Sequence, residues 1–61
     1  MTLADEIATA HVARMTAVTL RRIARRHPDR AEAARAVARG WMRLHHDAMT
    51  ALPRLIDEAQ S

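Results

Sequence analysis

A cluster of cationic side chains stands out between residues 19 and 30, in the stretch TLRRIARRHPDR. Arginine is the only cation there, and its planar guanidinium group suits phosphates and carboxylates, which it binds through paired hydrogen bonds. The cluster predicts a surface for nucleic acid or for another protein, with affinity that falls with salt. Its members are Arg21, Arg22, Arg25, Arg26 and Arg30.

The same arginines also have a purely structural interpretation. Cations near a helix C-terminus interact favourably with the helix dipole, and charge runs mostly face solvent. No aromatic residue lies among them for base stacking, and no helix-turn-helix pattern surrounds them. Both interpretations stay open at the level of the sequence.

Histidine offers the second candidate chemistry. His45 and His46 precede Asp47, but adjacent helical residues diverge by about 100°, so these three cannot ligate one ion together. A pair of His11 and His45 at similar heights in a hairpin is the remaining candidate. It lacks the Glu-x-x-His pattern of di-iron bundles. We therefore expect no metal and no cofactor, although the pair stays open.

Residues for catalysis are scarce. The chain has no cysteine and no tyrosine, its one serine is the last residue, Ser61, and no glycine-rich phosphate loop is present. The acids fall in the first or last turns of expected helices, where capping and solvation explain them. We expect the protein not to be an enzyme.

The elements that must position these residues are helical. One glycine, two prolines, no phenylalanine or tyrosine and abundant Ala, Arg, Leu and Met predict an all-α fold. Thr2 and Asp5 have the spacing of a helix N-terminus. The pattern then runs to Arg26 without a breaker.

A turn and a second helix follow. Pro28 disfavours the helical conformation for the residue before it. Asp29 and Glu32 repeat the start signal, with Asp29 as the N-cap. The link is short, so the predicted fold is an antiparallel helical hairpin of about 3–26 and 29–52.

Pro53 is the next residue that disfavours a helix. Within a helix it removes a hydrogen bond and crowds the preceding turn. The second helix should kink there or end near Leu52, and Thr50 could cap a short helical segment from Pro53 to Gln60. This segment lies beyond the reach of the first helix.

The second helix carries apolar residues at alternating spacings of three and four, which predicts a seam packed on the first helix. The seam residues are Ala34, Val37, Trp41, Leu44, Ala48, Ala51 and Leu55. Opposite them we expect Val12, Met15, Thr16, Thr19 and Ile23. Trp41 is the expected core anchor, or alternatively a contact for a partner protein.

The first helix is apolar on a further side, formed by Leu3, Ile7, Ala10, Ala17 and Val18. A helix that is apolar on two sides needs two partners. We therefore predict that the hairpin self-associates, most simply as a dimeric four-helix bundle. The predicted core and interface residues are Leu3, Ile7, Val12, Met15, Val18, Val37, Trp41, Leu44, Leu52 and Leu55.

Length and composition bound the rest. Sixty-one residues predict one domain over 1–61, with a core that is marginal when the chain folds alone. Disulfides are excluded because cysteine is absent. No signal peptide and no membrane span is expected, which favours the cytoplasm.

The expected function is therefore binding. The first hypothesis is a small homo-oligomeric adaptor, inhibitor or regulatory protein that acts through protein–protein contacts. The alternative is a nucleic-acid-binding regulator that uses the arginine cluster. A helix lying on a membrane surface is a third hypothesis, but the seam suits a coiled coil better than a lipid face.

Overall fold

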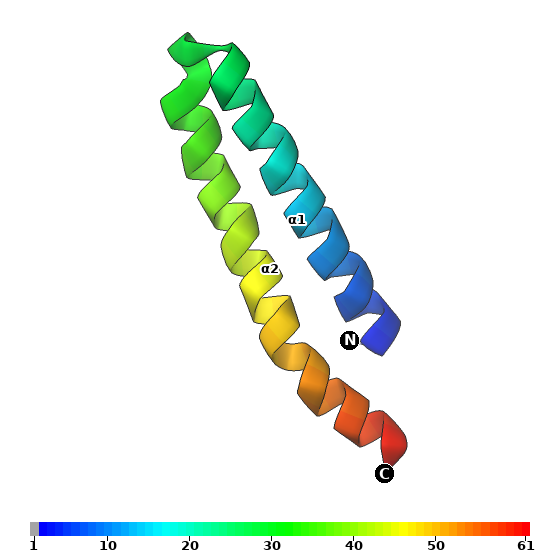
Figure 1. Cartoon of the computed structure of the whole chain (residues 1–61). Coiled ribbons are helices and arrows are strands. Elements are labelled where there is room, and N and C mark those ends of the chain that lie inside the picture. Colours follow the sequence, from blue (N-terminus) through cyan, green and yellow to red (C-terminus); the bar gives the residue numbers. More distant parts are fainter. Residues whose placement is uncertain (1) are drawn as a thin grey trace.

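The computed structural model describes residues 2–61. Helix α1 (Leu3–Arg26) is followed by a short 3-10 turn, η1 (Pro28–Arg30), and by helix α2 (Ala31–Gln60). The two helices lie side by side and antiparallel (Figure 1), in a rod 51 Å long and 13 Å across. The predicted all-α hairpin is confirmed. Neither helix has an apolar stretch long enough to cross a membrane within the described residues.

The N-terminus of α1 is held by a reciprocal pair of hydrogen bonds. The backbone N–H of Asp5 donates to the Thr2 hydroxyl, and the backbone N–H of Thr2 donates to the Asp5 carboxylate, both at 3.2 Å. This capping box satisfies amides that have no partner within the helix. The predicted start of the first helix is confirmed.

The turn between the helices begins where the sequence predicts it. The backbone N–H of His27 donates to the Ile23 carbonyl at 2.9 Å, and Pro28 then opens η1. The prediction that Asp29 caps a helix beginning at residue 29 is wrong, since no side chain caps α2. The reason is local. Pro28 suits the first position of a helical turn, so Asp29 lies inside η1 and not before the helix. There its carboxylate Oδ2 lies 3.8 Å from Nε of Arg30.

Helix α2 continues through Pro53, so the prediction of a separate C-terminal segment is wrong. The alternative expectation of a kink agrees with the change in direction of α2 near its yellow-to-orange transition (Figure 1). Thr50 does not cap a new helix, because its hydroxyl donates back to the His46 carbonyl at 2.9 Å. Beyond Pro53, α2 extends past the start of α1 (Figure 1).

The core between the helices is made of alanine. Its buried apolar residues are Ala10, Ala13, Ala17 and Ala24 from α1, and Ala31, Ala34, Ala38 and Ala48 from α2. Their spacings are three or four residues, or sums of these steps, as expected for one heptad seam. Side chains this small let two helices approach closely. Glu6 is the one charged residue of 2–61 that is also buried.

The predicted seam is wrong in part. Ala34, Trp41, Ala48 and Leu55 do lie on or beside the seam, but Val37 and Leu44 are 52% and 43% exposed. Each helix carries two neighbouring stripes with the same spacing, and hydrophobicity alone favours the stripe with larger side chains. The helices instead meet through the stripe of smaller ones.

The predicted packing face of α1 is wrong for the same reason. Val12 and Met15 are 52% and 50% exposed, and Ile23 also lies at the surface. Within the single chain, none of the ten predicted core and interface residues is fully buried. Half of them are exposed, namely Ile7, Val12, Met15, Val37 and Leu44, and half are half-buried, namely Leu3, Val18, Trp41, Leu52 and Leu55. Their role in an oligomer stays a prediction.

Candidate functional site

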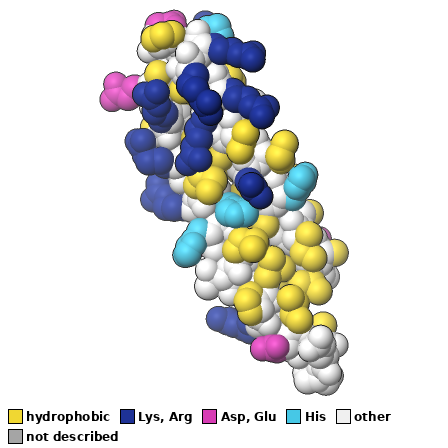
Figure 2. Space-filling model, viewed as in Figure 1, with side chains coloured by type: hydrophobic (Ala, Val, Ile, Leu, Met, Phe, Trp, Pro, Cys, Tyr) yellow, Lys and Arg dark blue, Asp and Glu magenta, His cyan; other side chains and the backbone are white. Residues whose placement is uncertain are grey.

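The hairpin has two broad sides, which the helical wheel separates on either flank of the alanine seam. We call the side toward the viewer in Figure 2 the front side. Cationic side chains gather on its upper half, near the turn, and apolar side chains on its lower half (Figure 2). The front side therefore combines two surfaces of different chemistry, end to end.

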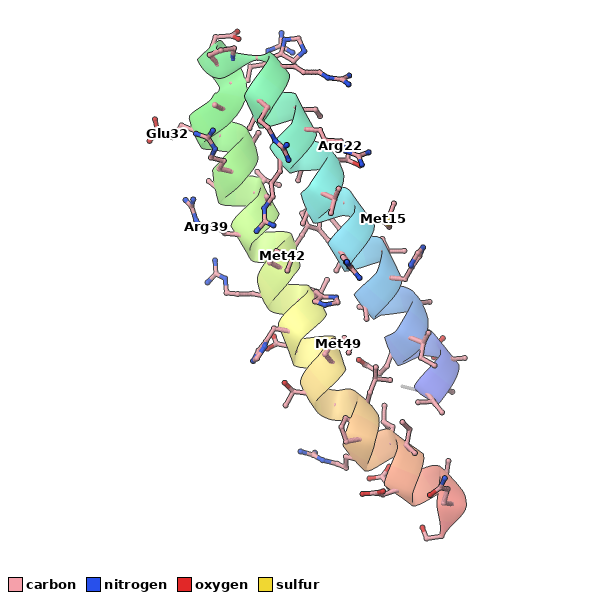
Figure 3. All side chains as sticks on the ribbon, in the orientation of Figure 1. Met15, Arg22, Glu32, Arg39, Met42 and Met49 are labelled. Atoms are coloured by element: carbon pink, nitrogen blue, oxygen red, sulfur yellow. The ribbon has the colours of Figure 1, made fainter. Side chains whose placement is uncertain are left out.

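The upper surface is an arginine patch that spans both helices. Its members are all exposed, and they are Arg14, Arg21 and Arg25 from α1 with Arg35 and Arg39 from α2. Arg39 forms its outer edge (Figure 3). Within residues 2–61 the one ion pair is between Arg30 and Asp29, so none of these five arginines is paired with an acid, and Glu32 lies beyond Arg39 on the same edge of α2 (Figure 3). The patch presents five cations to solvent over about 16 Å of helix.

The predicted arginine cluster is divided by this arrangement. Arg21 and Arg25 belong to the patch, whereas Arg22 points away from α2 on the outer side of α1 (Figure 3). The wheel places Arg26 on that outer side too, and Arg30 lies at the turn beside Asp29. The sequence stretch missed Arg14, Arg35 and Arg39. Finding them requires the register of α1 against α2, not a run of like residues.

The lower surface is a terminal apolar patch. Ile7, Met49 and Ile56 are 53%, 49% and 42% exposed, and Met42 is half-buried beside them. Met42 and Met49 lie along α2 on the side shown in Figure 3. A shallow, open hollow lined by Arg39, Met42, Arg43 and His46 lies where the two patches meet.

The opposite side of the hairpin carries an uncharged face, and Asp5 lies beyond it at the N-terminal end of the same α1 stripe. Val12, Thr16 and Ile23 form its α1 half, and Val37 and Leu44 form its α2 half. A second shallow hollow, lined by Met15, Thr16, Thr19 and Leu20, lies at its α1 edge. These residues repeat the three-and-four spacing, so each helix has a second seam next to the buried one.

His45 has a structural role in the seam. Its Nδ1 donates to the Ala10 carbonyl at 3.0 Å, across the two helices. The contact is feasible because the facing α1 residues are alanines. His11 is exposed, and no group of three potential metal ligands comes together within residues 2–61.

Charge is divided along the rod. Residues 14–43, near the turn, hold nine arginines and two acids, for a formal charge of +7. The remaining residues hold one arginine and five acids, for a formal charge of −4. The net charge of +3 is therefore the sum of a strongly positive half and a negative half of the rod.

No protein-family model matches the chain, and no curated protein or solved structure shows significant similarity to it. Function is therefore inferred from the chain's own surfaces.

Proposed function

We propose that two copies of the hairpin pack through their uncharged faces into a four-helix bundle, and that the bundle acts by binding another protein, as a small adaptor, inhibitor or regulator. One observation carries this proposal. The second seams of α1 and α2 lie on the same side of the hairpin, and they carry no charged residue between Val12 and Ile23 on α1 or between Val37 and Leu44 on α2. A four-helix bundle needs two seams on each helix, one for each neighbour.

The weakness of the single-chain core supports association. Its buried apolar side chains are all alanines, and a buried methyl-sized group contributes only about 0.8 kcal/mol. The larger side chains, Val12, Val37 and Leu44 among them, remain about half exposed. A second copy would remove them from water.

The side of the hairpin that carries the uncharged face is large enough for a dimer. The 24 residues of α1 give a length of about 36 Å, and two adjacent helices a width of roughly 20 Å, or about 700 Å² per copy. A standard stable interface buries about 800 Å² per partner.

The division of charge favours copies that run in opposite directions. This arrangement sets the +7 half of one copy beside the −4 half of the other, whereas turns at the same end would bring like charges together. The two-fold axis would then pass near Thr16 and Gly40, which lie at the same height when the His45–Ala10 contact sets the register. The space over Gly40 is open within one chain, because a Cβ added there meets no atom within 4 Å.

Light scattering coupled to size-exclusion chromatography tests the dimer with a matched pair of variants. Leu44→Glu places a charge on the uncharged face and should give a monomer of about half the mass. Met49→Glu makes the same change at a similarly exposed residue of the terminal apolar patch and should leave the dimer intact. A monomeric parent protein, or equal behaviour of the two variants, contradicts the proposal.

A further inference from the structure

We propose that the front side binds an amphipathic helix of an acidic partner protein, with acids along one half of that helix and apolar residues along the other. This inference names the partner class and rests on the proposed function, since the uncharged face is reserved for the second copy. The acidic half would lie on the arginine patch. The apolar half would lie on Ile7, Met42, Met49 and Ile56.

The two patches form one continuous track. They occupy the same side of the hairpin (Figure 2), and Arg39 of one patch and Met42 of the other line the same shallow hollow on α2. From Arg25 to Leu3 the track follows about 33 Å of α1, which a helix of roughly 22 residues would match. Two packed helices leave a groove in which a third helix can lie.

The chemistry of the track specifies what it can hold. None of the five arginines forms an ion pair within residues 2–61, so each can take a carboxylate as a paired hydrogen bond, and arginine suits this geometry better than lysine, which the chain lacks. Methionine adapts to varied apolar partners. Both halves of the track are satisfied by a ligand that is itself divided into acidic and apolar halves.

A second copy of this chain does not fit the front side. If two front sides met in opposite directions, the arginines of one would lie on the apolar patch of the other. If they met in the same direction, arginines would oppose arginines. Either arrangement leaves buried or repelling charges, which are costly.

Nucleic acid fits only half of the track. A phosphate backbone would neutralise the arginine patch but would leave Ile7, Met49 and Ile56 exposed. The one aromatic residue of the chain, Trp41, is half-buried and so presents little ring surface for stacking on bases. An acidic amphipathic helix would contact both patches. Duplex DNA is therefore included in the test as the competing ligand.

The experiment uses three labelled probes in fluorescence anisotropy with the full chain. The first is a synthetic helical peptide of about 22 residues, with glutamates in one half and a leucine stripe in the other. The second has the same composition with glutamates and leucines spread evenly along its length. The third is a duplex DNA of about 20 base pairs. The segregated peptide should bind at least about tenfold more tightly than the other two.

Two charge-matched pairs of substitutions locate the site. Arg21→Glu with Arg35→Glu changes the patch and should weaken binding of the segregated peptide by about tenfold or more. Arg22→Glu with Arg26→Glu makes the same charge change on the outer side of α1 and should weaken it by less than about threefold. If circular dichroism shows that the glutamate variants do not fold, the same arginines are replaced by glutamine instead.

Each other outcome overturns the inference. Equal binding of the two peptides would show that the division into halves is irrelevant. Equal loss in the two variant pairs would show that only net charge matters. Tighter binding of duplex DNA would assign the arginine patch to nucleic acid. Light scattering on the same samples reports the dimer independently, so loss of peptide binding in an intact dimer is distinguished from failure to dimerise.

Discussion

At the scale of single residues, the clearest electrostatic effect lies at the start of α1. The backbone N–H of Thr2, with a smaller contribution from the Thr2 hydroxyl, lowers the pKa of the Asp5 carboxyl below its usual value of 3.8. A carboxyl with a lowered pKa stabilises the folded state above its unfolded pKa. That contribution is lost as the pH falls through the folded pKa.

We therefore expect Asp5→Asn to be less stable than the parent near neutral pH, with the difference shrinking below about pH 4. Thermal unfolding followed by circular dichroism at about pH 7 and about pH 2.5 measures the difference. Thr2→Ala serves as the control. It should cost about 1 kcal/mol at neutral pH as a lost N-cap, yet keep most of the pH dependence, because the backbone N–H of residue 2 remains. A constant difference between Asp5→Asn and the parent across this range would contradict the assignment.

The sequence predicts individual residues well where the signal is local. The Thr2–Asp5 capping box and the stop before Pro28 follow from spacing and from the stereochemistry of proline. The arginine patch does not, because it joins α1 and α2. Arg21 and Arg35 become neighbours on one side only when the seam fixes how far each helix is rotated.

At the scale of helices, the alanine seam determines the geometry of the hairpin. Ala13 and Ala17 have no exposed surface, although alanine is the smallest side chain of the core. The helices must therefore be close together at this height. A larger side chain in this position has no space and would push the helices apart.

Ala17→Leu should destabilise the hairpin by about 1–3 kcal/mol through overpacking. Ala36→Leu makes the same change at an exposed position of α2 and should be within about 0.5 kcal/mol of the parent. Urea unfolding at fixed protein concentration compares the two variants. A stabilising effect of Ala17→Leu would show that the seam is looser than described.

The seam was also where sequence reasoning failed. Two stripes on each helix share the same spacing, and the stripe with Val37 and Leu44 has the greater hydrophobicity. Choosing between them requires the fit of α1 against α2, which no single-helix pattern contains. Pro53 is a similar case, since the cost of a proline within a helix is local, yet α2 continues through it with Leu52 and Leu55 half-buried on either side.

At the scale of the whole molecule, the separation of charge makes the relative direction of two copies testable. The chain has no cysteine, so single-cysteine variants are free of background. With opposite directions, residue 16 meets its own copy near the two-fold axis, within reach of a disulfide. With turns at the same end, residue 29 meets its own copy instead.

Thr16→Cys should therefore form a cross-linked dimer readily under mild oxidation, whereas Asp29→Cys should not. Non-reducing electrophoresis measures the cross-linked fraction over time. The reverse result would place the turns at the same end, and absence of both products would argue against a dimer through the uncharged face. High salt should slow the Thr16→Cys reaction, because it screens the attraction between the oppositely charged halves.

The alanine core has a further meaning for the abundance of the protein. A chain that gains much of its stability from a second copy is stable only above a threshold concentration. Below it, more of the chain is unfolded and open to proteases. Because Ala13, Ala17 and their neighbours give a weak core, the chain would be degraded rapidly when it is scarce and would last longer when it is abundant. The level of the protein would then depend steeply on its rate of synthesis.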